Sequence, residues 1–221
     1  MSKLTYKDII KNEEINAYID MGNKALGVLG YTEHSKGHAV KVADTASRIL
    51  KELGYDKKQI ELAKIAGYMH DIGNCVNRND HAHSGAIMAF EILKGLEMTP
   101  EDIAVVVSAI GNHDENTGSA VDPVSAAVII ADKTDVRRNR VRSKPKAGFD
   151  MHDRVNYAVM ESKVEVNKEK GTIHMDIHLD EDSCSVLDYF EIFLERMLMC
   201  RRAAEVLNMK FKLTANGSKV I

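Results

Sequence analysis

Cysteine is scarce in this chain of 221 residues, and the few cysteines form no pattern. Cys75, Cys184 and Cys200 are odd in number, lie far apart and show no paired spacing. A disulfide framework or a thiolate zinc site needs paired, suitably spaced cysteines, so we expect neither. Cys75 is interpreted as a packed thiol, because nothing near it in the sequence resembles a nucleophile relay. Free thiols fit a reducing compartment, and we expect a cytoplasmic protein.

Long apolar runs and an excess of one charge are also missing. No uninterrupted apolar segment approaches the ~20 residues that a bilayer span needs, and the start, MSKLTYKDIIKNEEI, has no apolar stretch behind its lysines. We therefore expect neither export nor a membrane as partner. The formal net charge of -3 provides no general attraction for nucleic acid, and 44% hydrophobic residues argue against a disordered chain. Nucleic acid is accordingly not the expected partner.

The first two-thirds of the chain has the periodicity of packed helices. Apolar residues recur there at spacings of three and four, which is typical of amphipathic helices. Two helix starts are marked by a capping side chain directly before Pro100 and directly before Pro123. We predict a helical domain over residues 1–150. Its helices are expected at 6–28, 35–53, 57–71, 82–96, 100–113 and 123–141.

The pattern changes after these helices. A basic loop, RSKPKAGFD, leads to a segment at 173–179 in which apolar residues alternate with others, which predicts a strand. Its expected partner is 160–167. The run 184–207 carries a wide apolar stripe and is expected to be a helix that packs in the core or in a homodimer contact, and a strand at 211–214 follows. We predict a mainly α fold: a helical bundle with a small C-terminal α+β (ββαβ) unit over 155–221.

Histidine is concentrated in the helical part. Six of the nine histidines lie between residues 34 and 113. His70 and Asp71 end KIAGYMHDIG, a helix apolar enough to be buried, and Asp132 interrupts the apolar AAVIIADK in the same way. A buried carboxylate is costly unless a metal or another cation offsets its charge. Imidazole and carboxylate ligands suit two divalent ions such as iron or manganese, with magnesium, zinc or nickel as alternatives, and such a pair suits phosphoryl chemistry.

An ordered set of these residues resembles the pattern of the HD-domain metal-dependent phosphohydrolases. The resemblance covers about residues 30–145 and rests on His38, HDIGN, a histidine four residues before Gly85, NHDE and ADK, in that order. It implies a helical HD domain in which Asp71 bridges two metal ions and a metal-activated hydroxide cleaves a phosphoester or phosphoanhydride. The implied metal ligands are His38, His70, Asp71, His81, His113 and Asp132.

Departures from the family pattern bear on the substrate. HDIGN has Asn74 where many relatives carry lysine, so one phosphate-contacting charge is absent. NHDE has Asp114 where the cyclic-dinucleotide branch has a second histidine, and no GYP tripeptide follows, which disfavours cleavage of cyclic di-GMP. The spacing and the HxxxGA turn are more similar to the dinuclear branch that hydrolyses diadenosine tetraphosphate.

Cations next to the metal ligands are the expected phosphate contacts. Lys133 directly follows Asp132, and Arg137 is expected about one helical turn beyond it. Both are predicted to bind and orient phosphate, so the predicted catalytic residues are Asp71, Lys133 and Arg137. The basic series that continues from Lys133 to Lys146 can equally be a solvated helix face and loop.

Two further residues are predicted to contact substrate. Arg78 lies in the loop between the HD pair and His81, and His83 follows His81 by two residues. His83 can also simply cap its helix. The remaining histidines are interpreted as structural or solvated groups and not as ligands: His34, His152, His174 and His178.

Several functions stay open on these residues. The first is an enzyme that hydrolyses a small phosphorylated substrate, a nucleotide, without a catalytic serine or cysteine because the metals supply the nucleophile. The second is a non-catalytic metal- and nucleotide-binding sensor or scaffold protein. The third is a nuclease, which the basic loop favours and the acidic net charge opposes.

Overall fold

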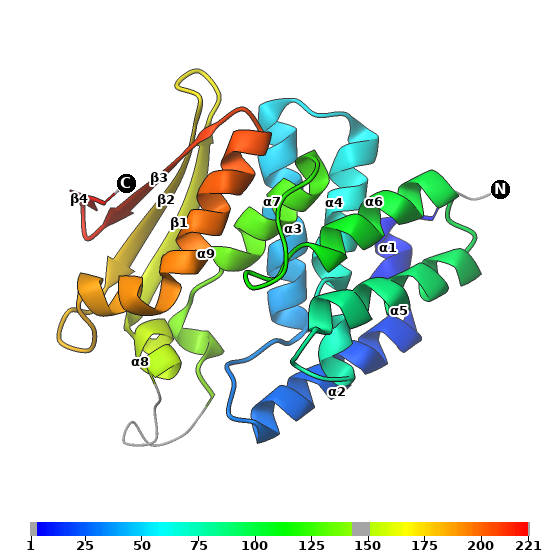
Figure 1. Ribbon diagram of the computed structural model, residues 1–221, viewed down its shortest axis with the longest axis horizontal. Coiled ribbons are helices and arrows are strands. Elements are labelled where there is room, and N and C mark those ends of the chain that lie inside the picture. Colours follow the sequence, from blue (N-terminus) through cyan, green and yellow to red (C-terminus); the bar gives the residue numbers. More distant parts are fainter. Residues whose placement is uncertain (1–3, 143–150, 221) are drawn as a thin grey trace.

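The chain consists of a helical bundle and a small sheet, with one long helix between them (Figure 1). The computed structural model describes residues 4–142 and 151–220. The mainly α fold with a C-terminal sheet is therefore confirmed. The basic loop predicted at 142–150 lies, apart from Arg142, outside the described residues. In the described ranges, no helix combines the length and the apolarity needed to cross a membrane.

Most of the bundle helices begin at a side chain that accepts a hydrogen bond from a free backbone N–H. Thr99 accepts a hydrogen bond from the backbone N–H of Asp102, and Asp122 accepts one from Ser125, each cap standing directly before a proline as predicted. The helices are α1 (Tyr6–Ile9), α2 (Glu13–Val28), α3 (Lys36–Leu53), α4 (Lys57–Met69), α5 (His81–Gly95), α6 (Pro100–Gly111) and α7 (Pro123–Lys133), with the 3-10 turn η1 (Ile72–Cys75) between α4 and α5.

Two predicted helices differ from the observed ones. The segment 6–28 forms two helices, because Asn12 caps a new helix by accepting from the backbone N–H of Ile15. The helix predicted over 123–141 ends at Lys133. There the Thr134 hydroxyl donates to the carbonyl of Ile130, and the chain continues through a 3-10 turn, η2 (Arg138–Arg140). Arg137, Arg138 and Arg140 are therefore not on one face of α7.

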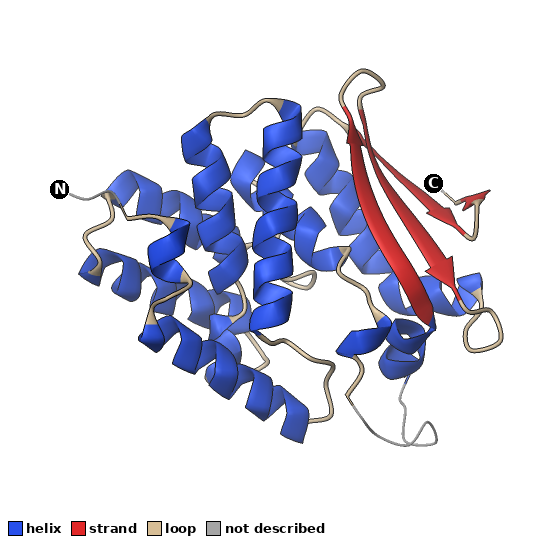
Figure 2. Cartoon of the chain, turned by 180° about the vertical axis from the view of Figure 1, so that it is seen from behind, coloured by secondary structure: helices blue, strands red, loops and turns tan. Residues whose placement is uncertain are grey.

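The C-terminal segment forms a twisted sheet on one side of the bundle (Figure 2). The predicted hairpin is β1 (Val159–Asn167) paired with β2 (Thr172–Leu179), and α9 (Val186–Val206) then crosses to β3 (Lys210–Ala215), which lies parallel to β2. The sequence did not indicate α8 (Met151–Ala158) or the short edge strand β4 (Ser218–Lys219). Among the described residues the strand order is β1-β2-β3-β4.

Helix α9 lies between the sheet and α7, and packs against both (Figure 1). Its buried Phe193, Met197 and Cys200 belong to the same hydrophobic cluster as Ile173 and Met175 of β2. His174 and His178 lie on the opposite face of that strand, in line with its alternation. The division into units at 1–150 and 155–221 stays a prediction. The packing of α9 matters for the site, because it brings a C-terminal helix next to the bundle.

Candidate metal centre

The HD dipeptide lies where α4 ends beside α3. At Gly67 a Cβ would lie 2.9 Å from the Cα of Ala43, so the two helices cross with their backbones almost in contact. This close crossing brings His38 of α3 next to His70, which caps the C-terminal end of α4. The chain then leaves the helix at Asp71. Asp71 is thus the residue between the C-cap of α4 and the turn η1.

The turn η1 packs backbone to backbone against the start of α5. A Cβ at Gly73 would overlap the carbonyl oxygen of His81 and would lie 2.5 Å from the amide nitrogen of Gly85. Only glycine fits this contact, because any side chain would separate the two segments. The contact holds His81, the first residue of α5, close to Asp71.

The Asp71 carboxylate stands between two pairs of imidazoles. Its Oδ2 lies 3.7 Å from Nε2 of His38 and 3.2 Å from Nε2 of His70, which together form the first histidine pair. Its Oδ1 lies 3.5 Å from Nε2 of His81 and 3.8 Å from Nε2 of His113, the second histidine pair. One carboxylate therefore faces four imidazole nitrogens, all brought from different segments of the bundle.

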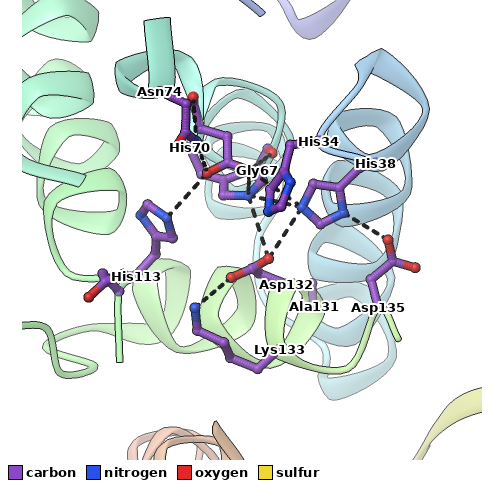
Figure 3. A network of polar contacts seen from close by, with 12 residues as sticks. His34, His38, Gly67, His70, Asn74, His113, Ala131, Asp132, Lys133 and Asp135 are labelled. Atoms are coloured by element: carbon purple, nitrogen blue, oxygen red, sulfur yellow. Dashed lines mark hydrogen bonds and ion pairs between the residues drawn. The ribbon is translucent and has the colours of Figure 1, made fainter. Parts of the chain in front are cut away.

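A second carboxylate completes the cluster. Asp132, near the end of α7, places Oδ1 at 3.3 Å from Nε2 of His38 and 3.6 Å from Nε2 of His70. Figure 3 shows these three residues and His113 turned toward one another from separate segments of the bundle. The structure thus brings together all six residues that the resemblance implied as ligands.

The ring orientations leave each Nε2 free to act as a ligand. The Nδ1 groups of His70, His81 and His113 lie 2.8, 3.0 and 2.6 Å from the carbonyl oxygens of Gly67, Arg78 and Ile110, to which they donate. A carbonyl only accepts, so Nδ1 carries the proton and Nε2 presents its lone pair. The Nδ1 of His38 donates in the same way to the Asp135 carboxylate, at 2.8 Å. Such outer partners fix the tautomer of a metal-binding histidine.

These lone pairs fit a cation between them. Within each histidine pair the two Nε2 atoms are only 3.2 and 3.1 Å apart, although in the neutral imidazoles neither Nε2 carries a proton to donate. The Oδ2 of Asp71 is buried without a hydrogen-bond partner among the described residues. Facing lone pairs and a buried carboxylate oxygen repel one another unless positive charge stands among them. The residues present therefore fit metal ions.

The pKa values of His70 and Asp71 are shifted by the charged groups packed around them. Burial lowers the pKa of His70, but the charges of Asp71 and Asp132 outweigh it and raise that pKa to about 10, so a proton would supply the positive charge at Nε2 when no metal ion is bound. Burial opposes ionisation of Asp71, yet His70 and His113 hold the pKa of this carboxyl well below its ordinary value. The cluster attracts positive charge, and among the described residues it contains three groups of side chains able to hold a metal ion.

A cavity of about 580 Å³ opens over the cluster. Asp71, His81, His113 and Asp132 form part of its lining, and Lys133 and Arg78 lie on its walls. The Lys133 ammonium contacts Asp132 at 2.8 Å and Glu115 at 2.6 Å. Arg78 donates to the Oδ1 of Asn74 at 3.2 Å, and Asn74 in turn donates to Asp71 at 2.7 Å. A cation thus stands near the position where the sequence lacked the family's lysine.

Two of the predicted substrate contacts are placed elsewhere. Because α7 ends at Lys133, Arg137 is not a helical turn beyond it. Its guanidinium instead binds the Asp135 carboxylate, with Nε 2.7 Å from Oδ1, and it does not line the cavity. The His83 side chain is 56% exposed, lies 3.7 Å from Asp80 and does not line the cavity either.

Several cavity residues were missed by sequence reasoning. Arg140 was seen only as part of a basic series, and His34 and His152 were set aside as isolated histidines. Glu115 was visible in NHDE, but nothing in the sequence indicated that it pairs with Lys133. Arg196 stands beside the apolar stripe of α9, and periodicity does not say which charged residue of a helix faces a site. The cavity lining that the sequence missed includes His34, Glu115, Arg140, His152, Asn156 and Arg196.

Asp135 is expected to tune metal affinity through His38. An Asp135→Asn substitution keeps the shape of the side chain but removes the charge that makes His38 a stronger ligand. We expect metal affinity to fall by ~10–100-fold, the usual cost of such an outer partner. Competition with a chromophoric chelator measures this loss. The exposed Asp20, which pairs with Lys36 at 2.7 Å, provides the control Asp20→Asn. Equal affinity in the two variants would contradict the expected role of Asp135.

Comparison with known proteins gives the family context. The HD domain family model matches residues 36–137, a range that contains all six implied ligands. An uncharacterized protein of Methanocaldococcus jannaschii is 30% identical over 210 residues, which cover 82% of this chain and 78% of that protein. The ribonuclease Y of Opitutus terrae is 33% identical over 150 residues, which cover 65% of this chain and 26% of that protein. The chain thus spans about a quarter of this ribonuclease Y.

One solved structure is also similar. It is described as a predicted HD superfamily hydrolase from an uncultured Thermotogales bacterium, with 26% identity, a TM-score of 0.44, and coverage of 56% of this chain and 67% of that chain. The closer likeness to the diadenosine-tetraphosphate branch stays a prediction. The family model and the Methanocaldococcus relative, of which more than three-quarters is covered, show that this chain belongs to the HD-domain family.

Proposed function

We propose that the chain is a metal-dependent phosphohydrolase that cleaves a phosphoester or phosphoanhydride of a nucleotide at a site for two divalent ions, iron or manganese. The position of Asp71 carries the proposal: one oxygen faces the first histidine pair and the other faces the second. A carboxylate shared between two sets of imidazoles suits a bridging ligand. Divalent ions held there would supply positive charge and lower the pKa of a coordinated water.

Lys133 is the group of this chain best placed to hold the substrate phosphate. Burial lowers the pKa of its ammonium, but Asp132 and Glu115 outweigh burial and raise it, so Lys133 stays charged. Glu115 also fixes the position of Lys133, with Oε2 2.6 Å from Nζ. A positioned ammonium on the cavity wall next to a metal ligand can bind a phosphate oxygen as a point charge.

The cavity supports a small substrate. Its volume of about 580 Å³ is within the ~300–1,000 Å³ range of small-molecule sites. Its lining is mostly polar and includes Thr32, Asn79 and Thr117. A phosphate at the ligands with an attached sugar and base fits such a volume and such a lining.

RNA cleavage is the second candidate function, and one observation favours it. The ribonuclease Y of Opitutus terrae matches 65% of this chain, and a phosphodiester of RNA is a substrate chemically related to the phosphoesters proposed above. Because phosphate contacts release counterions, RNA binding by this chain would weaken steeply as salt rises. Binding of a small nucleotide in the cavity would depend much less on salt.

A substrate screen tests the proposal. The purified protein, supplied with Mn²⁺ or Fe²⁺, is incubated with mononucleotides, dinucleoside polyphosphates, generic phosphoesters and a short RNA, and phosphate release or strand cleavage is measured. We expect turnover of a nucleotide substrate that depends on added metal and is lost in His81→Ala. Elemental analysis should give close to two ions per chain. Nucleotide binding without any product would contradict the proposal and would indicate a sensor or scaffold protein.

A further inference from the structure

The C-terminal helix α9 supplies one cation to the cavity over the metal centre. Arg196 lines this cavity, although it is more than sixty residues beyond the last ligand, Asp132. Its guanidinium lies over the ring of Phe193, 4.5 Å from the centroid, and its Nε donates to Oε1 of Glu115 at 3.0 Å. These two contacts fix both the position and the plane of the guanidinium.

Arg196 is linked to the metal ligands by alternating charges. Glu115 accepts from Arg196 through Oε1 and contacts Lys133 through Oε2, and Lys133 contacts Asp132 at 2.8 Å. Three contacts of hydrogen-bond length, with the carboxylate of Glu115 between them, span at most ~11 Å. The guanidinium is therefore within one small molecule's length of the ligand cluster.

Two cations of the cavity wall, Lys133 and Arg196, contact the same carboxylate, Glu115. Glu115 already has Lys133 as a partner, with Oε2 2.6 Å from Nζ, and Arg196 is its second cation, with Nε 3.0 Å from Oε1. When Asp132 serves a metal ion, two cations on the wall share one carboxylate. The Nη groups of Arg196 have no hydrogen-bond partner within 4–142 and 151–220, and its side chain is 25% exposed.

We propose that Arg196 binds a second anionic phosphate of the substrate, one that is not attacked, while the reacting phosphate lies at the metal centre. The proposal rests on the proposed function, since it takes the ligand cluster as the place of the reacting group. A planar guanidinium with free Nη groups presents a fork that matches two phosphate oxygens. The substrate class is then a compound with at least two phosphates, and the C-terminal unit selects for it.

Equilibrium binding of two phosphonates tests this proposal without turnover. Methylphosphonate carries one anionic group, and methylenediphosphonate carries two joined by a carbon that is not hydrolysed. Each is titrated by calorimetry into the full chain with Mn²⁺ in the same fixed excess, so that chelation in solution is equal for every variant. The variants are Arg196→Gln, Arg196→Lys and Arg201→Gln, the last removing an exposed arginine of the same helix as the matched control.

The expected result is a loss confined to the second phosphonate group. Arg196→Gln should lower the affinity for methylenediphosphonate by ~10-fold or more relative to Arg201→Gln, and the affinity for methylphosphonate far less. This is the size expected for the loss of a two-pronged, charge-assisted hydrogen bond. Arg196→Lys should keep part of the preference because it keeps the charge. Equal losses for both phosphonates would indicate a merely structural role, and no loss would mean no contact. Either result overturns the proposal.

The proposal and the proposed function fail in distinguishable ways. If no substrate is hydrolysed but Arg196→Gln still removes the preference for methylenediphosphonate, the chain binds doubly phosphorylated ligands as a sensor. If hydrolysis is found but Arg196→Gln binds both phosphonates with the same affinities as Arg201→Gln, the proposed hydrolase function is upheld and Arg196 has no part in substrate recognition. Thermal unfolding followed by circular dichroism verifies that each variant is folded.

Discussion

Replacing Asp71 with alanine is expected to abolish metal retention and turnover together. The substitution removes the carboxylate that both histidine pairs face. The Nε2 atoms within each pair are 3.1 to 3.2 Å apart, and without this negative charge the imidazoles alone hold a cation only weakly. The loss should exceed the ~10–100-fold cost of an outer partner, which places residual activity below ~1%. Elemental analysis of the purified variant measures the retained metal, and phosphate release measures turnover.

The control for Asp71 is an aspartate of the same charge outside the site. Asp20→Ala removes an exposed carboxylate of α2 and should change neither metal content nor turnover. The Asp71 variant should still fold, because the substitution also removes a buried carboxylate oxygen, Oδ2, that has no hydrogen-bond partner among the described residues. An Asp71→Ala protein that keeps full metal content and full activity would refute the metal centre and the function built on it.

Gly73→Ala is expected to destabilise the bundle strongly. The added Cβ would overlap the carbonyl oxygen of His81 and press on the amide of Gly85 at 2.5 Å, and both are backbone atoms that no rotamer change can move. Separating η1 from α5 should lower the free energy of unfolding by more than ~3 kcal/mol. If the variant still folds, its second histidine pair moves away from Asp71, so the bound metal should fall toward one ion per chain.

Gly95 offers the matched control for Gly73. It ends α5, the helix that η1 packs against, is exposed, and nothing lies within 4 Å of a Cβ added there. Alanine is the better helix former by ~1 kcal/mol, so Gly95→Ala should leave the protein as stable or slightly more stable. Urea denaturation of both variants measures the difference. Equal stability would mean that η1 and α5 are not held by the backbone contact.

The helices and their main limits could be predicted because they depend on local signals. Proline after a capping residue placed the starts of α6 and α7, and the alternation in 173–179 gave β2. The end of α7 at Lys133 could not be predicted. The apolar and basic residues beyond it continue a helical pattern, whereas the Thr134 side chain and the return of Arg140 to the carbonyls of Glu33 and Asp135 end it.

The metal ligands could be predicted from the sequence, whereas the residues that would bind the substrate could not. The implied ligands occur in a fixed order within HDIGN, NHDE and ADK, so a resemblance could identify them before any distance was known. The residues that would hold the substrate carry no such order. Arg137 was predicted from its spacing but forms an ion pair with Asp135 outside the cavity. Arg196 was not predicted and lines the cavity.

The sequence by itself determined the family, the helical character of the bundle and the set of side chains able to bind metal, because each depends on residue type and on spacing along the chain. Only the tertiary structure decided which imidazoles share an oxygen of Asp71, which cations reach the cavity, and that α9 forms part of its wall. Those relations arise from backbone contacts such as Gly67 against Ala43 and from the packing of α9 on α7. Contacts between distant segments leave no periodic trace in a sequence.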